Sequence, residues 1–160
     1  MKIAIYPGSF DPITNGHLDI LKRGAKIFDK VVIAVADNMR KEAVFSARER
    51  MDLIKNCTSD FKNVEIDRFT GLVVDYAKSV NASVIIRGLR QVTDFEYEFQ
   101  MALMNRQLNE DIDTIFLMPH EKYTYLSSSV VREITELDGD VSRFVPENVL
   151  KKLKNKYRRK

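Results

Sequence analysis

Residues 6–17 read Tyr-Pro-Gly-Ser-Phe-Asp-Pro-Ile-Thr-Asn-Gly-His and join a short strand-like run to a segment whose apolar residues have helical spacing. The two glycines of this string let the backbone approach a ligand closely. The start of a helix also offers free N–H groups and a positive dipole to an anion. A lone histidine such as His17 is more often a surface or capping residue. Directly after the first predicted strand, the complete string instead favours a phosphate-binding loop in which the His17 imidazole donates to a phosphate oxygen.

The same order of a strand-like run followed by a helical pattern repeats along the chain. Strands are predicted over Lys2–Tyr6, Lys30–Ala36, Val64–Phe69, Ala82–Arg87 and Thr114–Met118. Apolar spacing predicts helices over Leu18–Phe28, Leu72–Val80 and Ser127–Leu137. Two more helices are predicted to follow the capping-box sequences Ser46–Glu49 and Thr93–Glu96, and a last one begins at Pro146. This alternation predicts an α/β fold, a five-stranded parallel sheet with helices on both faces. Ligands of such sheets bind beyond the carboxyl ends of the strands.

Composition is that of an ordinary globular domain, with 160 residues of which 44% are hydrophobic and 31% charged. The longest apolar run, Val31–Ala36, is far shorter than the roughly 20 residues of a transmembrane helix, so no membrane association is expected. The N-terminus lacks the apolar core of a signal peptide. Cys57 is the only cysteine, which excludes an internal disulfide and indicates a reducing, cytoplasmic location.

The positive charge is concentrated at the C-terminus. Residues 151–160 hold seven Lys or Arg and no acid, whereas the remainder of the chain is net acidic. We therefore divide the chain into a domain over 1–150 and a basic tail over 151–160, the end of the last helix, and expect no nucleic-acid partner. Val149, Leu153 and Tyr157 form a helical stripe that predicts packing of this helix on the domain, with a frayed end. Deleting 154–160 should then leave turnover unchanged.

Arginines flank a glycine where the fourth predicted strand ends, in the sequence Arg87-Gly88-Leu89-Arg90. Two guanidinium groups at such a turn suit bidentate clamping of phosphates. Solvated surface charge is the alternative, and it explains an arginine at the end of a buried strand less well.

Three consecutive serines, Ser127 to Ser129, open a later helix and offer a second cradle for an anion. Simple N-capping needs only one of them. Lys41, which follows the second strand beside Arg40, is then a candidate for holding a second phosphate-bearing substrate. The glycine spacings of dinucleotide-binding and Walker-type loops are absent from the sequence, as are cysteine clusters for metal binding.

Four motifs in this order resemble the bacterial phosphopantetheine adenylyltransferase family of nucleotidyltransferases. Thr-Asn-Gly-His at 14–17 is similar to the family's Thr/His-x-Gly-His motif, and Leu-Ser-Ser-Ser-Val-Val-Arg at 126–132 to its Ile-Ser-Ser-Ser-x-x-Arg motif. The segments 86–98 and 144–149 narrow the match. The resemblance implies a Rossmann-like domain, Mg²⁺ with ATP, a homohexamer built from two trimers, and transfer of AMP from ATP to 4′-phosphopantetheine, giving dephospho-coenzyme A and pyrophosphate.

The resemblance also implies roles for individual residues. His17 would stabilise the transition state at the α-phosphate, together with Lys41 and Arg90. The residues implied to bind ATP are Ser9, Phe10, His17, Gly88, Leu89, Arg90, Glu98, Tyr123, Thr124, Tyr125, Leu126, Ser127, Ser128 and Ser129. Those implied to bind phosphopantetheine are Ser9, Lys41, Val73 and Arg87.

Two alternatives stay open from the sequence. One is another nucleotidyltransferase of the same fold, which transfers AMP to nicotinamide mononucleotide or CMP to glycerol 3-phosphate; the segment 86–98 argues against it. The other is a non-catalytic binding module whose basic tail recruits RNA or an anionic membrane.

Overall fold

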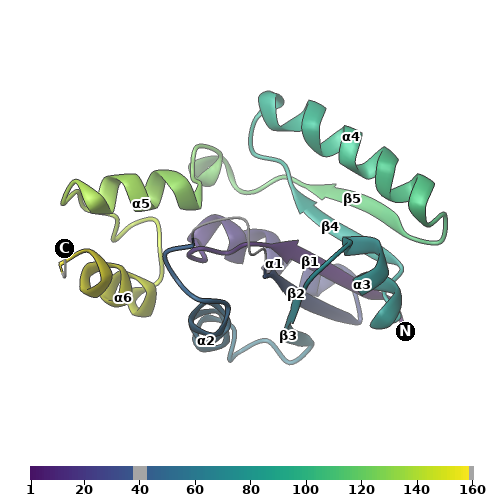
Figure 1. Ribbon diagram of the computed structural model, residues 1–160, viewed down its shortest axis with the longest axis horizontal. Helices are drawn as coiled ribbons and strands as arrows, with labels where there is room; N and C mark the ends of the chain where they lie inside the picture. The colour runs from purple at the N-terminus through teal and green to yellow at the C-terminus, as the bar shows by residue number, and fades with distance from the viewer. Residues whose placement is uncertain (38–42, 159–160) are drawn as a thin grey trace.

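A parallel sheet of five strands forms the centre of the computed structural model, which describes residues 1–37 and 43–158 (Figure 1). The strands are β1 (Ile3–Gly8), β2 (Lys30–Ala36), β3 (Val64–Phe69), β4 (Val84–Gly88) and β5 (Asp113–Leu117). Their order in the sheet is β3-β2-β1-β4-β5, with every pair parallel. The predicted α/β architecture is therefore confirmed, and each strand lies within two residues of its predicted bounds.

Six α helices of the described residues connect and extend the sheet. They are α1 (Asn15–Ile27), α2 (Ala47–Cys57), α3 (Val73–Ser79), α4 (Val92–Leu108), α5 (Ser128–Glu136) and α6 (Glu147–Tyr157), with a short 3₁₀ helix, η1 (Glu121–Tyr123), before α5. None of them is long and apolar enough to cross a membrane.

Alternate side chains of the central strands fill two separate hydrophobic cores, one on each face of the sheet. Tyr6 and Ile33 belong to the larger core, which also holds Leu21 of α1 and Ile54 of α2. Ile5 belongs to the smaller core, with residues of α3. Burial on both faces explains why the strands read as continuous apolar runs.

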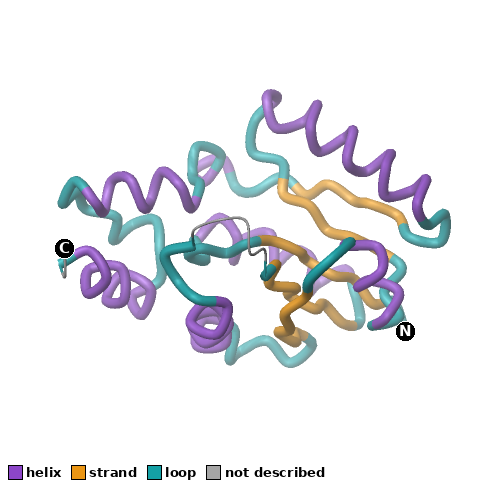
Figure 2. Tube along the Cα trace, viewed as in Figure 1, coloured by secondary structure: helices purple, strands orange, loops and turns teal. Residues whose placement is uncertain are grey.

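The chain reverses its winding direction between β1 and β4, which are neighbours in the sheet although two strands separate them in sequence. In an open parallel sheet, the loops at such a point diverge and leave a crevice beyond the strand ends. Figure 2 shows the loops that follow the strands on the side of the sheet where α5 and α6 lie, opposite the N-terminus. The crevice is therefore bounded by the first loop and by the start of α5.

One of the two predicted capping boxes is confirmed. The Ser46 hydroxyl accepts from the Glu49 N–H at the start of α2, and the Glu49 carboxylate accepts from the Ser46 N–H. The box predicted over Thr93–Glu96 is wrong, because Gln91 occupies the N-cap of α4 and the helix begins one residue before Thr93. Asp94 instead forms an ion pair with Arg90, on the turn that leads out of β4.

The basic tail continues α6 as an ordered helix through Tyr157. Leu153 is fully buried, and Tyr157 packs against the larger core. The Lys156 ammonium lies 3.1 Å from a Glu49 carboxylate oxygen and 5.5 Å from the centre of the Phe45 ring. The predicted packing of the Val149, Leu153 and Tyr157 stripe on the domain is therefore confirmed, and residues 159–160 lie outside the described residues.

These contacts add a prediction on stability to the expectation that deleting 154–160 leaves turnover unchanged. Truncation after Tyr157 should leave both turnover and the melting temperature unchanged, since it removes no packed side chain of the described residues. Truncation after Leu153 should lower the melting temperature by several degrees, because it removes the Tyr157 packing and the Lys156–Glu49 pair. Thermal unfolding of the two truncated proteins and the full chain tests this. Equal melting temperatures for the two truncations would contradict it.

Candidate active site

A cavity of about 700 Å³ opens at the carboxyl ends of β1 and β4, where the winding direction reverses. It brings together most of the residues predicted as a site: Ser9, Phe10, His17, Val73, Arg87, Gly88, Arg90, Glu98, Tyr123, Leu126, Ser127, Ser128 and Ser129. Three predicted residues, Leu89, Thr124 and Tyr125, are not among those that line it. Lys41 lies outside the described residues.

Hydrogen bonds at the start of α1 hold the His17 imidazole in one orientation. The Thr14 N–H donates to His17 Nδ1 over 3.1 Å, and the Thr14 hydroxyl accepts from the His17 N–H over 3.3 Å. The same pair therefore forms a capping box in which histidine takes the place of Glu or Gln. Because Nδ1 accepts a backbone N–H, the neutral ring carries its proton on Nε2. His17 is thus a capping residue and a cavity donor at once, where the sequence presented these as alternatives.

His17 is neutral at physiological pH. Burial, and then the positive charges of Arg90 and Arg87, lower the pKa of His17 from 6.5 to about 4. A neutral imidazole donates one hydrogen bond from Nε2 and holds it without titrating between pH 5 and pH 8. Such a group suits stabilisation of charge on an oxygen better than proton transfer.

An aromatic stack beneath His17 fixes the shape of the first loop. The Phe10 ring packs edge-on against both neighbours, with centroids 5.1 Å from His17 and 5.3 Å from Tyr6. Phe10 is 3% exposed and adopts a positive φ of 47°. A Cβ at Gly8 would lie only 3.0 Å from the Phe10 ring, so the glycine permits this close packing. The loop is therefore preorganised around the histidine.

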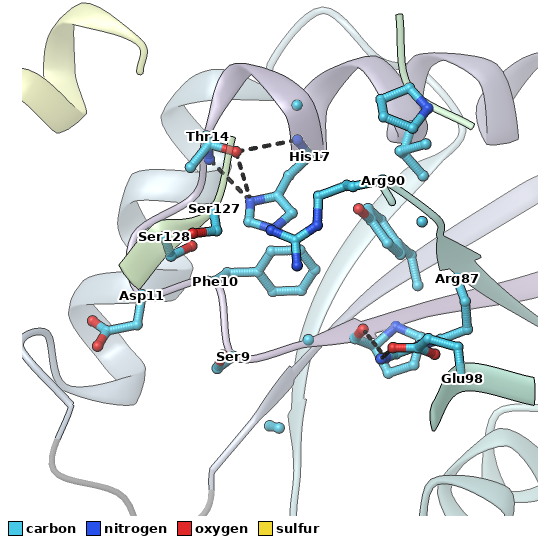
Figure 3. A pocket seen from close by; sticks show the side chains of 18 of the residues that line it. Ser9, Phe10, Asp11, Thr14, His17, Arg87, Arg90, Glu98, Ser127 and Ser128 are labelled. Carbon is cyan, nitrogen blue, oxygen red and sulfur yellow. Dashed lines mark hydrogen bonds and ion pairs between the residues drawn. The ribbon is translucent and has the colours of Figure 1, made fainter. Parts of the chain in front are cut away.

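The two predicted arginines occupy different parts of the cavity (Figure 3). Arg87 forms a bidentate ion pair with Glu98, with Nε 2.7 Å from Oε2, and also donates to the Pro7 carbonyl. Arg90 lies nearer His17 and donates to the Leu126 carbonyl over 2.9 Å. Arg87 and Glu98, which the resemblance assigns to different substrates, are thus direct partners.

Each of the three serines at the start of α5 has its own role. Ser127 is the N-cap, and its hydroxyl accepts from the Val130 N–H over 3.2 Å. The Ser128 hydroxyl donates to the Pro12 carbonyl over 2.7 Å and so ties α5 to the first loop. The Ser129 hydroxyl lies 3.0 Å from that of Ser127. The helix terminus therefore faces the cavity beside the first loop, as an anion cradle requires.

Three charged residues of the site carried no predicted role. Arg50 and Asp11 are 4% and 5% exposed, and Arg132 donates to the Asp11 carbonyl and faces its carboxylate at 3.7 Å. Arg132 was visible as the end of the serine motif. Nothing in the sequence indicates that Arg50 is buried, because an arginine in a charged amphipathic helix is usually a surface residue.

A magnesium ion has no protein cage in the described residues, which contain no group of three or more His, Cys, Asp or Glu side chains able to hold a metal. The Asp11 carboxylate already accepts from two backbone N–H groups and faces Arg132. The site therefore fits a metal that enters on the phosphates of a nucleotide, the usual way in which Mg²⁺ binds at phosphoryl-transfer sites.

The chain is similar to several known proteins along nearly its whole length. Residues 5–134 match the model of the cytidylyltransferase-like family. The chain is 57% identical to a phosphopantetheine adenylyltransferase of Caldanaerobacter subterraneus over 99% of both chains. It is 54% identical to one of Geotalea daltonii over 99% of both chains. A solved structure from Vibrio parahaemolyticus, assigned as a nicotinate-nucleotide adenylyltransferase, covers the whole chain with a TM-score of 0.75 at 19% identity, which supports the fold.

Proposed function

The chain belongs to the cytidylyltransferase-like family and within it to the phosphopantetheine adenylyltransferases, and from this membership we propose that it transfers AMP from ATP to 4′-phosphopantetheine in the cytoplasm. The products are dephospho-coenzyme A and pyrophosphate. The observation that carries the proposal is the identity of 57% over 99% of both chains, at a site whose first loop and α5 present anion-binding groups to one cavity.

The reaction needs no general base. The nucleophile is the phosphate monoester of 4′-phosphopantetheine, whose second pKa of about 6 leaves it largely dianionic at pH 7. One of its oxygens attacks the α-phosphorus of ATP, and the bond from that phosphorus to the bridging oxygen of pyrophosphate breaks. Catalysis then consists of aligning two polyanions and neutralising their repulsion. The cavity supplies guanidinium groups, a neutral histidine donor and a helix N-terminus for this purpose.

His17 and Arg90 face the triphosphate in this assignment. His17 Nε2 donates to a non-bridging oxygen of the α-phosphate, where negative charge builds up in the transition state. Arg90 lies close enough to lower the His17 pKa, and its own guanidinium is anchored on the Leu126 carbonyl. The start of α5 receives the outer phosphates of ATP, and Mg²⁺ bound to those phosphates would supply further neutralisation of their charge.

The acceptor occupies the part of the cavity beneath α4. Arg87 and the apolar residues Val73, Met101 and Ala102 line the cavity. Two polar groups interrupt this lining. Asn105 is 8% exposed, and the Thr114 hydroxyl is buried with no hydrogen-bond partner among the described residues. An apolar slot with isolated polar groups suits the pantetheine arm, which has two amides on an aliphatic chain.

Three reaction mixtures test the function. The purified protein is incubated with MgATP and 4′-phosphopantetheine, with MgATP and nicotinamide mononucleotide, or with MgCTP and glycerol 3-phosphate. Pyrophosphate release and the mass of the product are then followed. We expect dephospho-coenzyme A from the first mixture and no product from the others. Pyrophosphate from only one of the other mixtures would mean that its phosphorylated substrate, and not 4′-phosphopantetheine, is the acceptor. Folded protein that binds ATP and stays silent in all three would favour a non-catalytic module.

We also propose that the chain assembles as a homohexamer of two trimers. Helix α4 supports an assembly, because it carries large apolar side chains on its exposed surface as well as beneath it. The exposed ones are Phe95, Tyr97, Phe99, Met101, Leu103, Met104 and Leu108, which are 38–62% exposed in the single chain. Phe95, Phe99 and Leu103 are spaced four residues apart and so form one exposed apolar row along the helix, and such a row marks a protein–protein interface.

Leu103→Glu should therefore reduce the mass of the assembly, because Leu103 is 50% exposed within this row and a carboxylate there would be buried at an interface. Light scattering coupled to size exclusion measures the mass. Leu137→Glu is the matched control, since Leu137 is 77% exposed outside α4. A hexamer that persists in Leu103→Glu, or one that dissociates equally in the control, would contradict the assignment of α4.

A further inference from the structure

Tyr6 is a buried tyrosine whose hydroxyl has no hydrogen-bond partner among the described residues. It is 6% exposed and lies on β1, where its ring belongs to the larger hydrophobic core. Tyr6 also lines the cavity. Buried tyrosines usually satisfy their hydroxyl, because a polar group that loses water without gaining a partner costs free energy. A phenylalanine would occupy the same space in the core without that cost, so the hydroxyl of Tyr6 needs an explanation.

The hydroxyl reaches the open space of the cavity. Among the described residues, Thr114 Oγ1 is the only side-chain polar atom that is both sealed from solvent and without a partner. The Tyr6 hydroxyl has no partner either and is not sealed, so it is accessible from the cavity. The ring itself packs against that of Phe10, with the two centroids 5.3 Å apart. Tyr6 therefore presents one polar atom to a ligand and packs the remainder of its side chain in the core.

The hydroxyl lies beside the end of β4. A Cβ at Gly88 would be 3.9 Å from the Tyr6 hydroxyl oxygen, so this oxygen is next to the backbone that carries Arg87 and leads to Arg90. Both guanidinium groups act on Tyr6 electrostatically, and Arg87 does so more strongly than Arg90. The hydroxyl thus lies among cations that the proposed function assigns to phosphates, and it is influenced most by the one assigned to the acceptor.

The Tyr6 hydroxyl remains a donor at physiological pH. Burial raises the pKa of Tyr6 well above its ordinary value, although the positive charges of Arg87 and Arg90 oppose this effect. Glu98, the carboxylate that acts on Tyr6, accepts from Arg87 through both of its oxygens and not from the hydroxyl. The unused donor therefore suits an incoming anion, and a phosphate oxygen is an anion that both arginines also attract.

We propose that Tyr6 binds the acceptor phosphate: its hydroxyl donates a hydrogen bond to the same phosphate group that Arg87 neutralises, and so helps to hold the attacking oxygen in place. The inference rests on the proposed function, because the assignment of Arg87 to 4′-phosphopantetheine comes from it. Arg87 supplies charge, whereas Tyr6 supplies a neutral donor on a strand of the sheet. A donor held by the core has little freedom to lose when the substrate binds, which suits it to orientation.

Tyr6→Phe removes one oxygen atom and leaves the ring to pack as before. The dissociation constant of 4′-phosphopantetheine, measured by calorimetry, should rise about tenfold or more, as expected for a lost hydrogen bond to a charged group. The KM for 4′-phosphopantetheine should rise in parallel, while the dissociation constant and the KM of ATP should change much less. The melting temperature of the unliganded protein should stay the same or rise, because the variant loses a hydroxyl that has no partner.

Tyr76→Phe is the matched control. The Tyr76 hydroxyl donates to Asp67 Oδ2 over 2.9 Å, and Tyr76 is not among the residues that line the cavity. This variant should leave the affinities for both substrates unchanged. Its melting temperature should fall or stay the same, since it loses an existing hydrogen bond.

An unchanged affinity of Tyr6→Phe for 4′-phosphopantetheine would overturn the proposal, whatever the melting temperature. Weaker binding of ATP alone would overturn it as well, because the hydroxyl would then contact the nucleotide. Wild-type protein that binds 4′-phosphopantetheine without turnover would overturn the proposed reaction, while the calorimetric comparison would still decide the role of Tyr6. Wild-type protein that does not bind 4′-phosphopantetheine would overturn both.

Discussion

His17→Ala should lower kcat by about 10²–10³-fold while the KM for ATP changes much less. Removing one preorganised donor to a developing oxyanion typically costs this much. The structure gives the reason for a large effect on kcat alone. The Thr14 N–H fixes Nδ1 as the acceptor, so that Nε2 carries the donor proton, and Phe10 packs against the ring. The donor is therefore already oriented before the transition state forms.

The matched control for His17→Ala is His120→Ala, which removes the other histidine of the chain. His120 caps the short η1 helix, accepting from the Lys122 N–H, and is not among the residues that line the cavity. Steady-state kinetics of both variants should show a large loss of kcat for the first and less than threefold for the second. A kcat for His17→Ala within tenfold of the wild type would remove His17 from the catalytic step.

The pH dependence of the rate distinguishes a fixed donor from a general base. Because burial and the neighbouring arginines lower the pKa of His17 to about 4, its protonation begins to matter only well below pH 5. The acid decline of kcat/KM for the acceptor should therefore lie near pH 6, where the acceptor phosphate takes up its second proton. The same decline should persist in His17→Ala. Its disappearance in that variant would mean that His17 is the titrating group.

Much of this site could be predicted because its parts are local in sequence. The first loop joins β1 to α1, Arg87 and Arg90 lie at or just after the end of β4, and the serines follow β5, so the strand pattern alone places them at one edge of the sheet. Arg50 could not be found in this way. Its acceptors, the backbone carbonyls of Ser9 and Ala36, are 41 and 14 residues away, and nothing in α2 distinguishes it from a solvated charge.

The start of α4 was mispredicted for a related physical reason. The sequence Thr93–Glu96 satisfies the local rule for a capping box, yet the turn after β4 determines where the helix begins. There the Asp94 carboxylate lies 3.3 Å from Arg90 Nε, and Gln91 becomes the N-cap. The helix thus begins earlier than the local sequence pattern predicts, at a turn that also places Arg90 in the cavity lining.

Arg87→Ala should raise the KM for 4′-phosphopantetheine by about 10²-fold and leave the KM for ATP within about threefold. A charge-assisted hydrogen bond contributes about 1.5–3 kcal/mol, and each 1.4 kcal/mol is a factor of ten in affinity. The variant also leaves the Glu98 carboxylate, whose side chain is 13% exposed, without its bidentate partner. An unpaired anion there repels the acceptor dianion, which adds to the loss.

Glu98→Gln is the informative companion of Arg87→Ala. It keeps an acceptor for one Arg87 N–H but removes the competing negative charge, so we expect acceptor binding to be preserved or tightened. In the double variant, the loss caused by Arg87→Ala should be smaller than in the wild-type background, because no buried carboxylate is left unpaired. Initial-rate kinetics with both substrates varied measure these terms. A rise in the KM for ATP alone would contradict this assignment. It would mean that Arg87 and Glu98 bind ATP, so that ATP and not 4′-phosphopantetheine occupies the part of the cavity beneath α4.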